Sequence, residues 1–194
     1  MKTLQYIIIC GCLIFSGLAS AVEYRDYSQI KTGILTSQQE LANLPMSGPA
    51  WENILAAASQ STALPDLSNQ DDNTNMHVLA KALVYARTGD QQMRQQVVDA
   101  IINVIGTHNG GNTLALAQKL GTYIVAADLI SLDGQDNEQF RSYLSSVLYE
   151  PIAGRVGINN LADSALRDPG YWGCNARGTV AAAARYLNDD LLLD

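Results

Sequence analysis

Cysteine is scarce in this chain of 194 residues, which holds only three. Two of them, Cys10 and Cys12, lie in an apolar stretch at the N-terminus. If that stretch is removed, Cys174 has no partner within the chain, so a fold held by internal disulfides is excluded. Cys174 is then either a nucleophile or a small buried side chain at the start of a helix, and burial is the more ordinary state of cysteine.

Basic residues are also few. The chain carries 12 Lys and Arg against 19 Asp and Glu, a formal net charge of −7. Nucleic-acid-binding domains normally show the opposite balance, so we expect no nucleic-acid partner. The same acidic surface disfavours the capture of other polyanions, unless a local basic cleft overrides it.

Long apolar runs are missing except at the N-terminus. There Lys2 precedes an apolar run over residues 6–15, and small residues follow at the positions expected for cleavage. This pattern is typical of a secretory signal peptide, residues 1–21, and is too short for a membrane span. We therefore expect a mature domain of residues 22–194 that is periplasmic or secreted and has no membrane partner. Loss of Lys2 takes the net charge to −8.

Strand signals are absent too, since no alternating pattern and no Asn-Gly hairpin occurs. Helical spacing predicts helices throughout. Several helix ends have recognisable chemistry, because Ser37-Gln-Gln-Glu40 is a capping box, Pro49 suits a first turn, and Asp90 can cap a helix. The expected helices cover residues 37–44, 49–58, 76–89, 90–106, 113–131, 137–149 and 176–187.

The connections between the expected helices alternate in length. If successive helices are antiparallel, all the long connections lie on one rim, together with three helix N-termini, which favour anions. The pattern predicts an all-α fold of about three stacked, antiparallel helical hairpins. Short turns at 88–90, 132–134 and 188–190 alternate with longer polar connections at 60–73, 107–112 and 152–173.

Residues Asp168–Ala183 contain the closest grouping of side chains suited to binding or catalysis. An aromatic pair, a thiol, an amide and a guanidinium precede an alanine-rich helix there. Trp172 could stack on a sugar ring or anchor the loop to the core. Asn175 could bind a carboxylate or serve as the N-cap of the helix. Arg177 lies in the expected first turn, where the helix dipole disfavours a positive charge. We therefore expect it to bind an anion or to form an ion pair with Asp168. The same two interpretations apply to Arg167.

The two histidines are far apart in the sequence. His77 lies beside the apolar stripe of its expected helix, as a proton shuttle or as a solvated edge residue, and His108 lies in a polar turn. Neither has a suitably spaced ligand partner, and the aspartates near residue 70 lack the EF-hand order. We expect no metal site and no cofactor.

Five short motifs occur in order along the expected mature chain. In that order they resemble the alginate lyase-like polysaccharide lyases, which are secreted (α/α) toroid proteins. Because those toroids are longer, the resemblance implies an incomplete toroid, truncated at its C-terminus. The motifs are Ser37-x-x-Glu-Leu41, Gly48-Pro-Ala-Trp51, Leu79-Ala-x-Ala-Leu-Val-Tyr-Ala-Arg-Thr-Gly-Asp90, Ala126-Ala-Asp-Leu-Ile130 and Trp172-Gly-x-x-Ala176.

The resemblance also implies an activity, the cleavage of a uronate-containing polysaccharide such as alginate by β-elimination. An amide or guanidinium neutralises the uronate carboxylate, a Tyr or His takes the C5 proton, and a Tyr donates to the leaving oxygen. The family's Asn-Asn pair is replaced here by Gly170-Tyr171, so Asn175 is the displaced candidate for the neutralising amide. The resemblance implies Tyr171, Asn175 and His77 as catalytic residues, and Trp172, Arg167, Arg177 and Asn73 as substrate-binding residues.

Two other functions remain open. The chain could be a non-catalytic glycan-binding protein or an inactive helical-repeat remnant. It could also be a glycoside hydrolase on the same fold, which needs two carboxylates facing each other across a cleft. Asp168 with Asp71 or Asp72 would supply that pair.

Overall fold

The computed structural model describes residues 33–192, so the expected signal peptide lies outside the described residues. This part of the chain confirms the all-α prediction, because it contains helices and no strand. None of its helices has both the length and the apolar character needed to cross a membrane. The elements are α1 (Gln38–Ala42), α2 (Pro49–Ala58), α3 (Thr74–Thr88), α4 (Gln91–Asn103), α5 (Thr113–Leu129), α6 (Gly134–Val147), α7 (Leu161–Arg167), α8 (Gly170–Leu187) and the 3-10 helix η2 (Asp190–Leu192).

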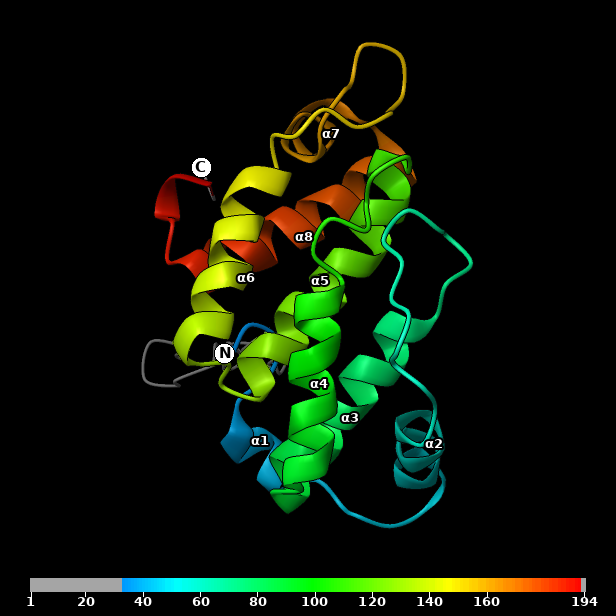
Figure 1. The fold of residues 1–194 in the computed structure, drawn as a ribbon, viewed down its shortest axis with the longest axis vertical. Coiled ribbons are helices and arrows are strands. Elements are labelled where there is room, and N and C mark those ends of the chain that lie inside the picture. Colours follow the sequence, from blue (N-terminus) through cyan, green and yellow to red (C-terminus); the bar gives the residue numbers. More distant parts are fainter. Residues whose placement is uncertain (1–32, 193–194) are drawn as a thin grey trace, which may run out of the picture.

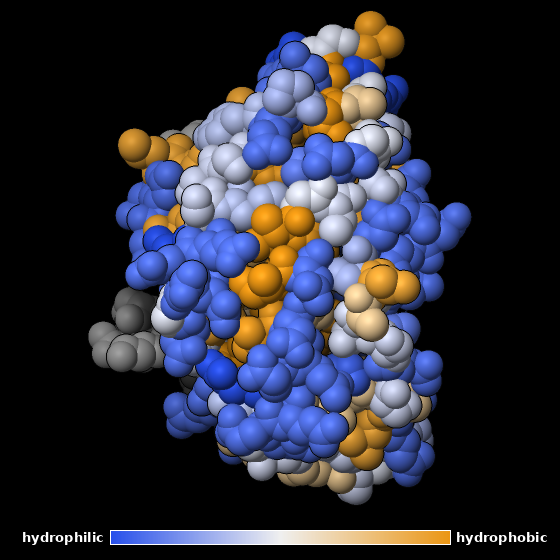
Figure 2. Space-filling model, viewed as in Figure 1, coloured by the Kyte–Doolittle hydropathy of each residue, from blue (hydrophilic) through white to orange (hydrophobic). Residues whose placement is uncertain are grey.

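Helices α3, α5 and α8 lie side by side and run in the same direction, with α5 in the middle (Figure 1). Helices α2, α4 and α6 run in the opposite direction; α2 and α4 contact α3, and α6 contacts α8. The outer face seen in Figure 2 is mostly hydrophilic, with an apolar strip beside α6. Successive long helices are therefore antiparallel, as the alternating connections predict.

The three long connections meet at one rim, close to the N-termini of α3, α5 and α8 (Figure 1). Leu67 N donates to Thr107 Oγ1 over 3.1 Å, which joins the first connection to the second. Thr113 N donates to Ala153 O over 2.7 Å, which joins the second to the third. The tight turns lie at the other end, so the one-rim arrangement expected from loop lengths is present.

The helix ends show the chemistry that the sequence predicts. Ser37 Oγ accepts from Glu40 N over 3.0 Å, and Ser37 N donates to the Glu40 carboxylate over 2.9 Å. Asp90 Oδ1 accepts from Gln92 N and Met93 N and so caps α4. Gly89 ends α3 with φ of 74°, a left-handed conformation that glycine adopts without steric cost.

The core is shared by all the long helices except α2 and is centred on α5, whose Leu116, Leu120 and Ile124 are fully buried. Helix α8 approaches α5 closely at Gly121, where a Cβ would lie 2.8 Å from Thr179 Oγ1. Thr179 Oγ1 also donates to Ala117 O over 2.6 Å, which satisfies a buried hydroxyl. The small residue thus sets the spacing of α5 and α8, the two helices that position the site described below.

The segment 152–173, expected to be irregular, is half helical. It contains α7, whose N-cap Asn160 accepts from Asp163 N over 2.7 Å. Helix α8 begins at Gly170 rather than at Ala176. The Pro-Gly pair and three glycines argue locally against a helix there. Packing of α7 and α5 against α8 overrides that preference, so Tyr171 and Trp172 lie in the first turn of a helix and not in a loop.

Candidate functional site

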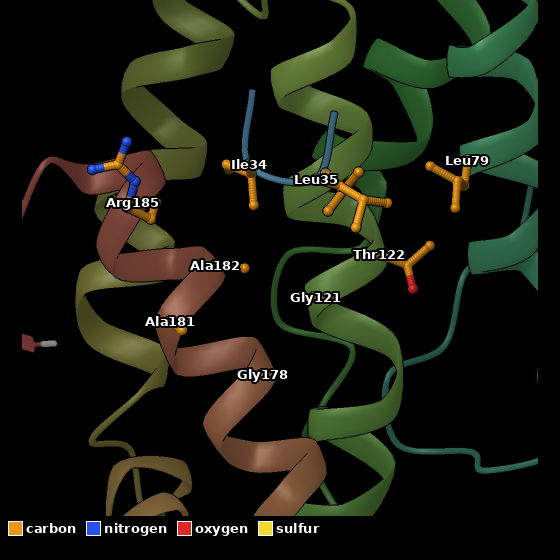
Figure 3. A pocket seen from close by; sticks show the side chains of 10 residues that line it. Ile34, Leu35, Leu79, Gly121, Thr122, Gly178, Ala181, Ala182 and Arg185 are labelled. Atoms are coloured by element: carbon orange, nitrogen blue, oxygen red, sulfur yellow. The ribbon is translucent and has the colours of Figure 1, made fainter. Parts of the chain in front are cut away.

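An open cavity of about 380 Å³ lies over α5, between α3 and α8 (Figure 3). Its floor is apolar or uncharged, formed by Leu79 of α3, by Gly121, Thr122 and Val125 of α5, and by Gly178 and Ala181 of α8. Arg185 stands at one end of it. We use the word groove for this cavity together with the surface of α5 and α8 between it and Tyr171, a residue that does not itself line the cavity.

The groove is hollow because α5 and α8 present small residues to it. Gly121 is required by helix packing, as described above. Gly178 is not, since a Cβ built there meets nothing within 4 Å. Ala181 adds only a methyl group and is exposed. The floor is therefore a broad apolar surface, a shape that suits the flat face of a sugar ring or another compact ligand.

One end of the groove is bordered by the chain segment before α1. Ile34 N donates to Asp128 Oδ2 of α5 over 2.9 Å. Gly33 is in close contact with the same carboxylate, where a Cβ would collide with it. As Figure 3 shows, the segment crosses the groove so that Ile34 and Leu35 border the cavity near Leu79 and Arg185.

The other end of the groove, nearer the rim, is polar. Gln118 Nε2 of α5 donates to Tyr171 Oη of α8. One turn further along α5, Thr122 Oγ1 accepts from Asn75 Nδ2 of α3 over 3.2 Å. Asn75 is 3% exposed, and its Oδ1 has no partner within residues 33–192. The groove thus carries a phenol and the Gln118 amide at one end and a guanidinium at the other.

Sequence reasoning missed Gln118, Thr122 and Asn75. A signal was available, because Gln118 and Thr122 are four residues apart in a mostly apolar helix and so share one face. Which residues of α3 and α8 face that pair depends on how the helices cross. Periodicity along one helix does not contain that information.

Tyr171, Trp172 and Asn175 lie together in the first two turns of α8. The Tyr171 side chain is 63% exposed, and Trp172 is half-buried. Asn175 is not the N-cap of its helix, as one interpretation held, because α8 starts five residues earlier. Its Nδ2 donates instead to Tyr171 O over 2.8 Å, one turn back.

His77 and Asn73 do not join the groove. Asn75 faces α5, and His77 comes two residues later, which on an α-helix turns it to the opposite side. There His77 Nδ1 lies 3.2 Å from Ser61 O, in the connection after α2. Asn73 is exposed at the start of α3 and makes no side-chain cap.

Arg167 and Arg177 stabilise the junction of α7 with α8. Arg167 pairs with Asp163 and donates to Gly157 O. Arg177 donates to Asp168 O over 3.1 Å, so it contacts the backbone of the residue with which an ion pair was expected. Both arginines have protein acceptors, on the side of α8 that faces α7.

The Asp168 carboxylate cannot face a cleft, because the residue is only 1% exposed. Its Oδ2 accepts from Ser164 Oγ over 2.8 Å, and its Oδ1 lies 3.8 Å from Arg155 Nε. A hydrolase needs both carboxylates at the scissile bond. The pairing of Asp168 with Asp71 or Asp72 that a glycoside hydrolase would use is therefore not formed.

His108 is buried and not simply part of an exposed turn. Its Nε2 lies 2.9 Å from Glu150 Oε2, and its Nδ1 lies 3.0 Å from the Tyr143 hydroxyl. Burial, reinforced by the nearby Glu150 carboxylate, raises the pKa of Tyr143. This network links α6 with the segment that follows α4. It lies apart from the groove, so we assign it a structural role.

Within residues 33–192, no group of three or more His, Cys, Asp and Glu side chains is placed to hold a metal ion. Cys174, for which burial was the more ordinary expectation, is exposed on α8, between Tyr171 and Gly178. No family model, no curated protein and no solved structure matches this chain. Any functional assignment therefore depends on the chemistry of the groove.

Proposed function

We propose that this chain is a secreted polysaccharide lyase-type protein that cleaves uronate-containing polysaccharides, such as alginate, by β-elimination. The observation that carries the proposal is the groove, with a phenol held at its polar end. An extended sugar chain could lie along α3, α5 and α8, its apolar ring faces on the floor. The polar groups of the chain would then meet Gln118 and Tyr171 near the rim.

We assign both proton transfers to Tyr171. Gln118 holds the phenolic oxygen at the edge of the groove. As a phenolate, that oxygen would take the C5 proton of the uronate and pass it to the leaving glycosidic oxygen, while the C4–O bond breaks and a new C4–C5 double bond forms. The elimination also needs a donor that stabilises the charge developing on the carboxylate. The amide of Asn175, one turn along α8 from Tyr171, is the candidate.

The arrangement of the helices supports this assignment. Three parallel helices form one layer, three antiparallel helices pack outside it, and the long connections share one rim. An incomplete (α/α) toroid would have this arrangement, with the groove on its inner layer. Secretion and a substrate outside the cell follow from the N-terminal pattern of Lys2 and the apolar run.

The test is to incubate the purified chain with alginate and with other polyuronates and to follow the ultraviolet absorbance of the unsaturated product. We expect absorbance to rise with at least one polymer and Tyr171→Phe to abolish the rise. Tyr149→Phe is the matched control, because Tyr149 is similarly exposed, at 55%, but lies outside the groove. No absorbance change with any uronate polymer would reject the catalytic proposal.

A second candidate is a glycan-binding protein without turnover. It is favoured by the absence of an imidazole from the groove, since His77 faces the connection after α2 and His108 is buried. Binding of a uronate oligosaccharide without a new double bond would select it. Release of reducing sugar without the double bond would instead select a hydrolase.

A further inference from the structure

We propose that Arg185 binds the carboxylate of an acidic sugar at the end of the groove remote from Tyr171. This inference depends on the proposed function, because it assumes that a uronate chain lies along the groove. It adds an anion-binding subsite and gives the two ends of the groove different roles: Tyr171 transfers protons, and Arg185 binds substrate. Three observations carry it.

The first is that the Arg185 side chain has no partner among residues 33–192. Residues 33–192 contain nine Lys and Arg side chains, and eight of them donate to a backbone carbonyl or pair with a carboxylate. Only the side chain of Arg185 makes no hydrogen bond or ion pair with any other residue in that range, although it borders the groove. The eight engaged residues are Lys81, Arg87, Arg94, Lys119, Arg141, Arg155, Arg167 and Arg177.

The second observation is the charge of the cavity. The chain as a whole carries a net charge of −7, yet among residues 33–192 no acidic side chain lines the cavity, and Arg185 is the only charged one that does. Asp128 of α5, which lines a neighbouring pocket together with Arg185, already accepts from Ile34 N. The cavity is thus a local cationic site on an acidic molecule. Such a site allows an acidic ligand to bind although the overall charge disfavours it.

The third observation is position. Tyr171, Gly178 and Arg185 are spaced seven residues apart on α8 and so lie on one face of the helix. Tyr171 and Arg185 are separated by roughly 21 Å along the helix axis, given its rise per residue. A carboxylate bound by Arg185 therefore belongs to a sugar several rings away from the bond that Tyr171 would cleave.

This separation predicts a specific kinetic effect. A contact remote from the reacting atoms is made equally in the ground state and in the transition state, so losing it raises KM and leaves kcat unchanged. Arginine suits the role because its planar fork of N–H donors matches a carboxylate in two parallel hydrogen bonds. Lysine at this position would keep the charge but lose that geometry.

The experiment compares the wild type, Arg185→Gln, Arg185→Lys and Arg94→Gln. Arg94→Gln is the matched charge control, because Arg94 pairs with Asp133 outside the groove. Each variant is titrated calorimetrically with a uronate oligosaccharide and with the same oligosaccharide after its carboxyl groups have been reduced to alcohols. The rate of Cys174 alkylation, read by peptide mass spectrometry, reports whether ligand occupies the face of α8 that carries Tyr171.

We expect Arg185→Gln to weaken binding of the acidic oligosaccharide about tenfold, the effect of losing one charge-assisted hydrogen-bonding group. Binding of the reduced oligosaccharide should stay the same, and Arg185→Lys should fall between the two. Arg94→Gln should bind both as the wild type does. Ligand should slow the alkylation of Cys174, and on a cleaved polymer Arg185→Gln should raise KM alone.

Unchanged affinity of Arg185→Gln for the acidic oligosaccharide would overturn the inference, as would an equal loss for both ligands. It would also be overturned if the wild type bound neither oligosaccharide. The two proposals fail separately. If Tyr171→Phe abolishes turnover while Arg185→Gln binds normally, only the Arg185 subsite is wrong. If no polymer is cleaved but Arg185→Gln loses affinity, only the lyase activity is wrong.

Discussion

Gly178 shows how one residue can open a site. It lies in the interior of α8, where a glycine costs about 0.5–1 kcal/mol relative to alanine. Nothing within 4 Å would oppose a Cβ there, so helix packing does not require glycine at this position. We infer that the absent side chain leaves room in the groove, at some cost in stability.

Gly178→Ala should therefore stabilise the protein and weaken ligand binding. We expect the free energy of unfolding to rise by about 0.5–1 kcal/mol in urea denaturation, because alanine favours the helix. The affinity for a uronate oligosaccharide should fall, because the methyl group enters the cavity. Gly121→Ala is the contrasting variant, since its Cβ would press on Thr179 and lower stability. Equal affinity of Gly178→Ala and wild type would contradict this role.

His108 shows the opposite case, a titratable residue used for structure. Its two ring nitrogens are engaged by Glu150 and by the Tyr143 hydroxyl, and the residue is buried. Its partners come from α6 and the end of that helix, 35 and 42 residues away. Nothing in the polar turn around His108 indicates this distant network.

His108→Ala should destabilise the protein by about 2 kcal/mol, because the Tyr143 hydroxyl and the Glu150 carboxylate each lose a partner. Chemical denaturation measures the change. His77→Ala serves as the comparison, and we expect it within about 0.5 kcal/mol of wild type, since His77 is only half-buried. Similar losses for the two variants would show that the His108 network contributes little.

Among the helices, the junction of α7 with α8 depends most on tertiary contacts. Helix α8 turns away from α7 at Asp168, and Gly173 packs against the carbonyl oxygen of that residue so closely that a Cβ would collide with it. Arg177 donates to the same oxygen. The first turn of α8, with Tyr171, is thus held by contacts to the backbone that precedes it.

Gly173→Ala should displace that first turn. We expect a loss of about 2 kcal/mol or more in the free energy of unfolding, the range of an overpacked contact, together with impaired function of Tyr171. The neighbouring Cys174→Ala is the control, because Cys174 is exposed and its truncation removes no buried contact. A crystal structure of Gly173→Ala with an undisplaced first turn would refute the expectation.

Helix α2 is attached differently from the other long helices. Its Ala58 packs with Ala80 and Val84 in a small cluster separate from the main core. Lys81 of α3 is buried and donates from Nζ to Ala58 O, at the last turn of α2. That carbonyl lies at a helix C-terminus, where a cation is favourable.

Lys81→Met should loosen α2, because it keeps most of the side-chain volume but leaves the Ala58 carbonyl without its donor. We expect a loss of about 1–3 kcal/mol and faster hydrogen exchange in α2 than in α5. Burial lowers the pKa of Lys81 below its ordinary 10.5. Between that lowered pKa and 10.5 the unfolded chain holds more protons, so the stability of the wild type should rise with pH relative to that of Lys81→Met. Parallel pH profiles would contradict this.

Across the whole molecule, charge and shape are distributed unevenly. The outer face is mostly hydrophilic (Figure 2), and the chain is acidic overall, with a sequence pI of about 4.7. The cavity of the groove is apolar and carries a single positive charge at Arg185. An acidic polymer would therefore be held locally at the groove and repelled by the rest of the surface, which restricts where along the molecule it can bind.

Much of the fold was predictable from the sequence, and the failures have a common cause. The capping box of Ser37, the caps at Gly89 and Asp90 and the helical spacing of α3 to α6 depend on residues a few positions apart. The start of α8 was predicted wrongly, because glycines and Pro169 give a local signal that packing overrides. Asn175 was accordingly assigned to the wrong turn of its helix.

Local hydrogen bonds and apolar periodicity act over at most a few turns of chain, so the order of helices α1 to α6, several of their ends and the rim of the long connections could be read from residues alone. The groove could not. It depends on two hydrogen bonds between residues far apart in the sequence, Gln118 to Tyr171 across 53 residues and Asn75 to Thr122 across 47. It also depends on the Arg185 side chain, which has no such partner among residues 33–192. Which side chains meet across neighbouring helices depends on crossing angles and helix spacing, and these are set by the packing of the entire core.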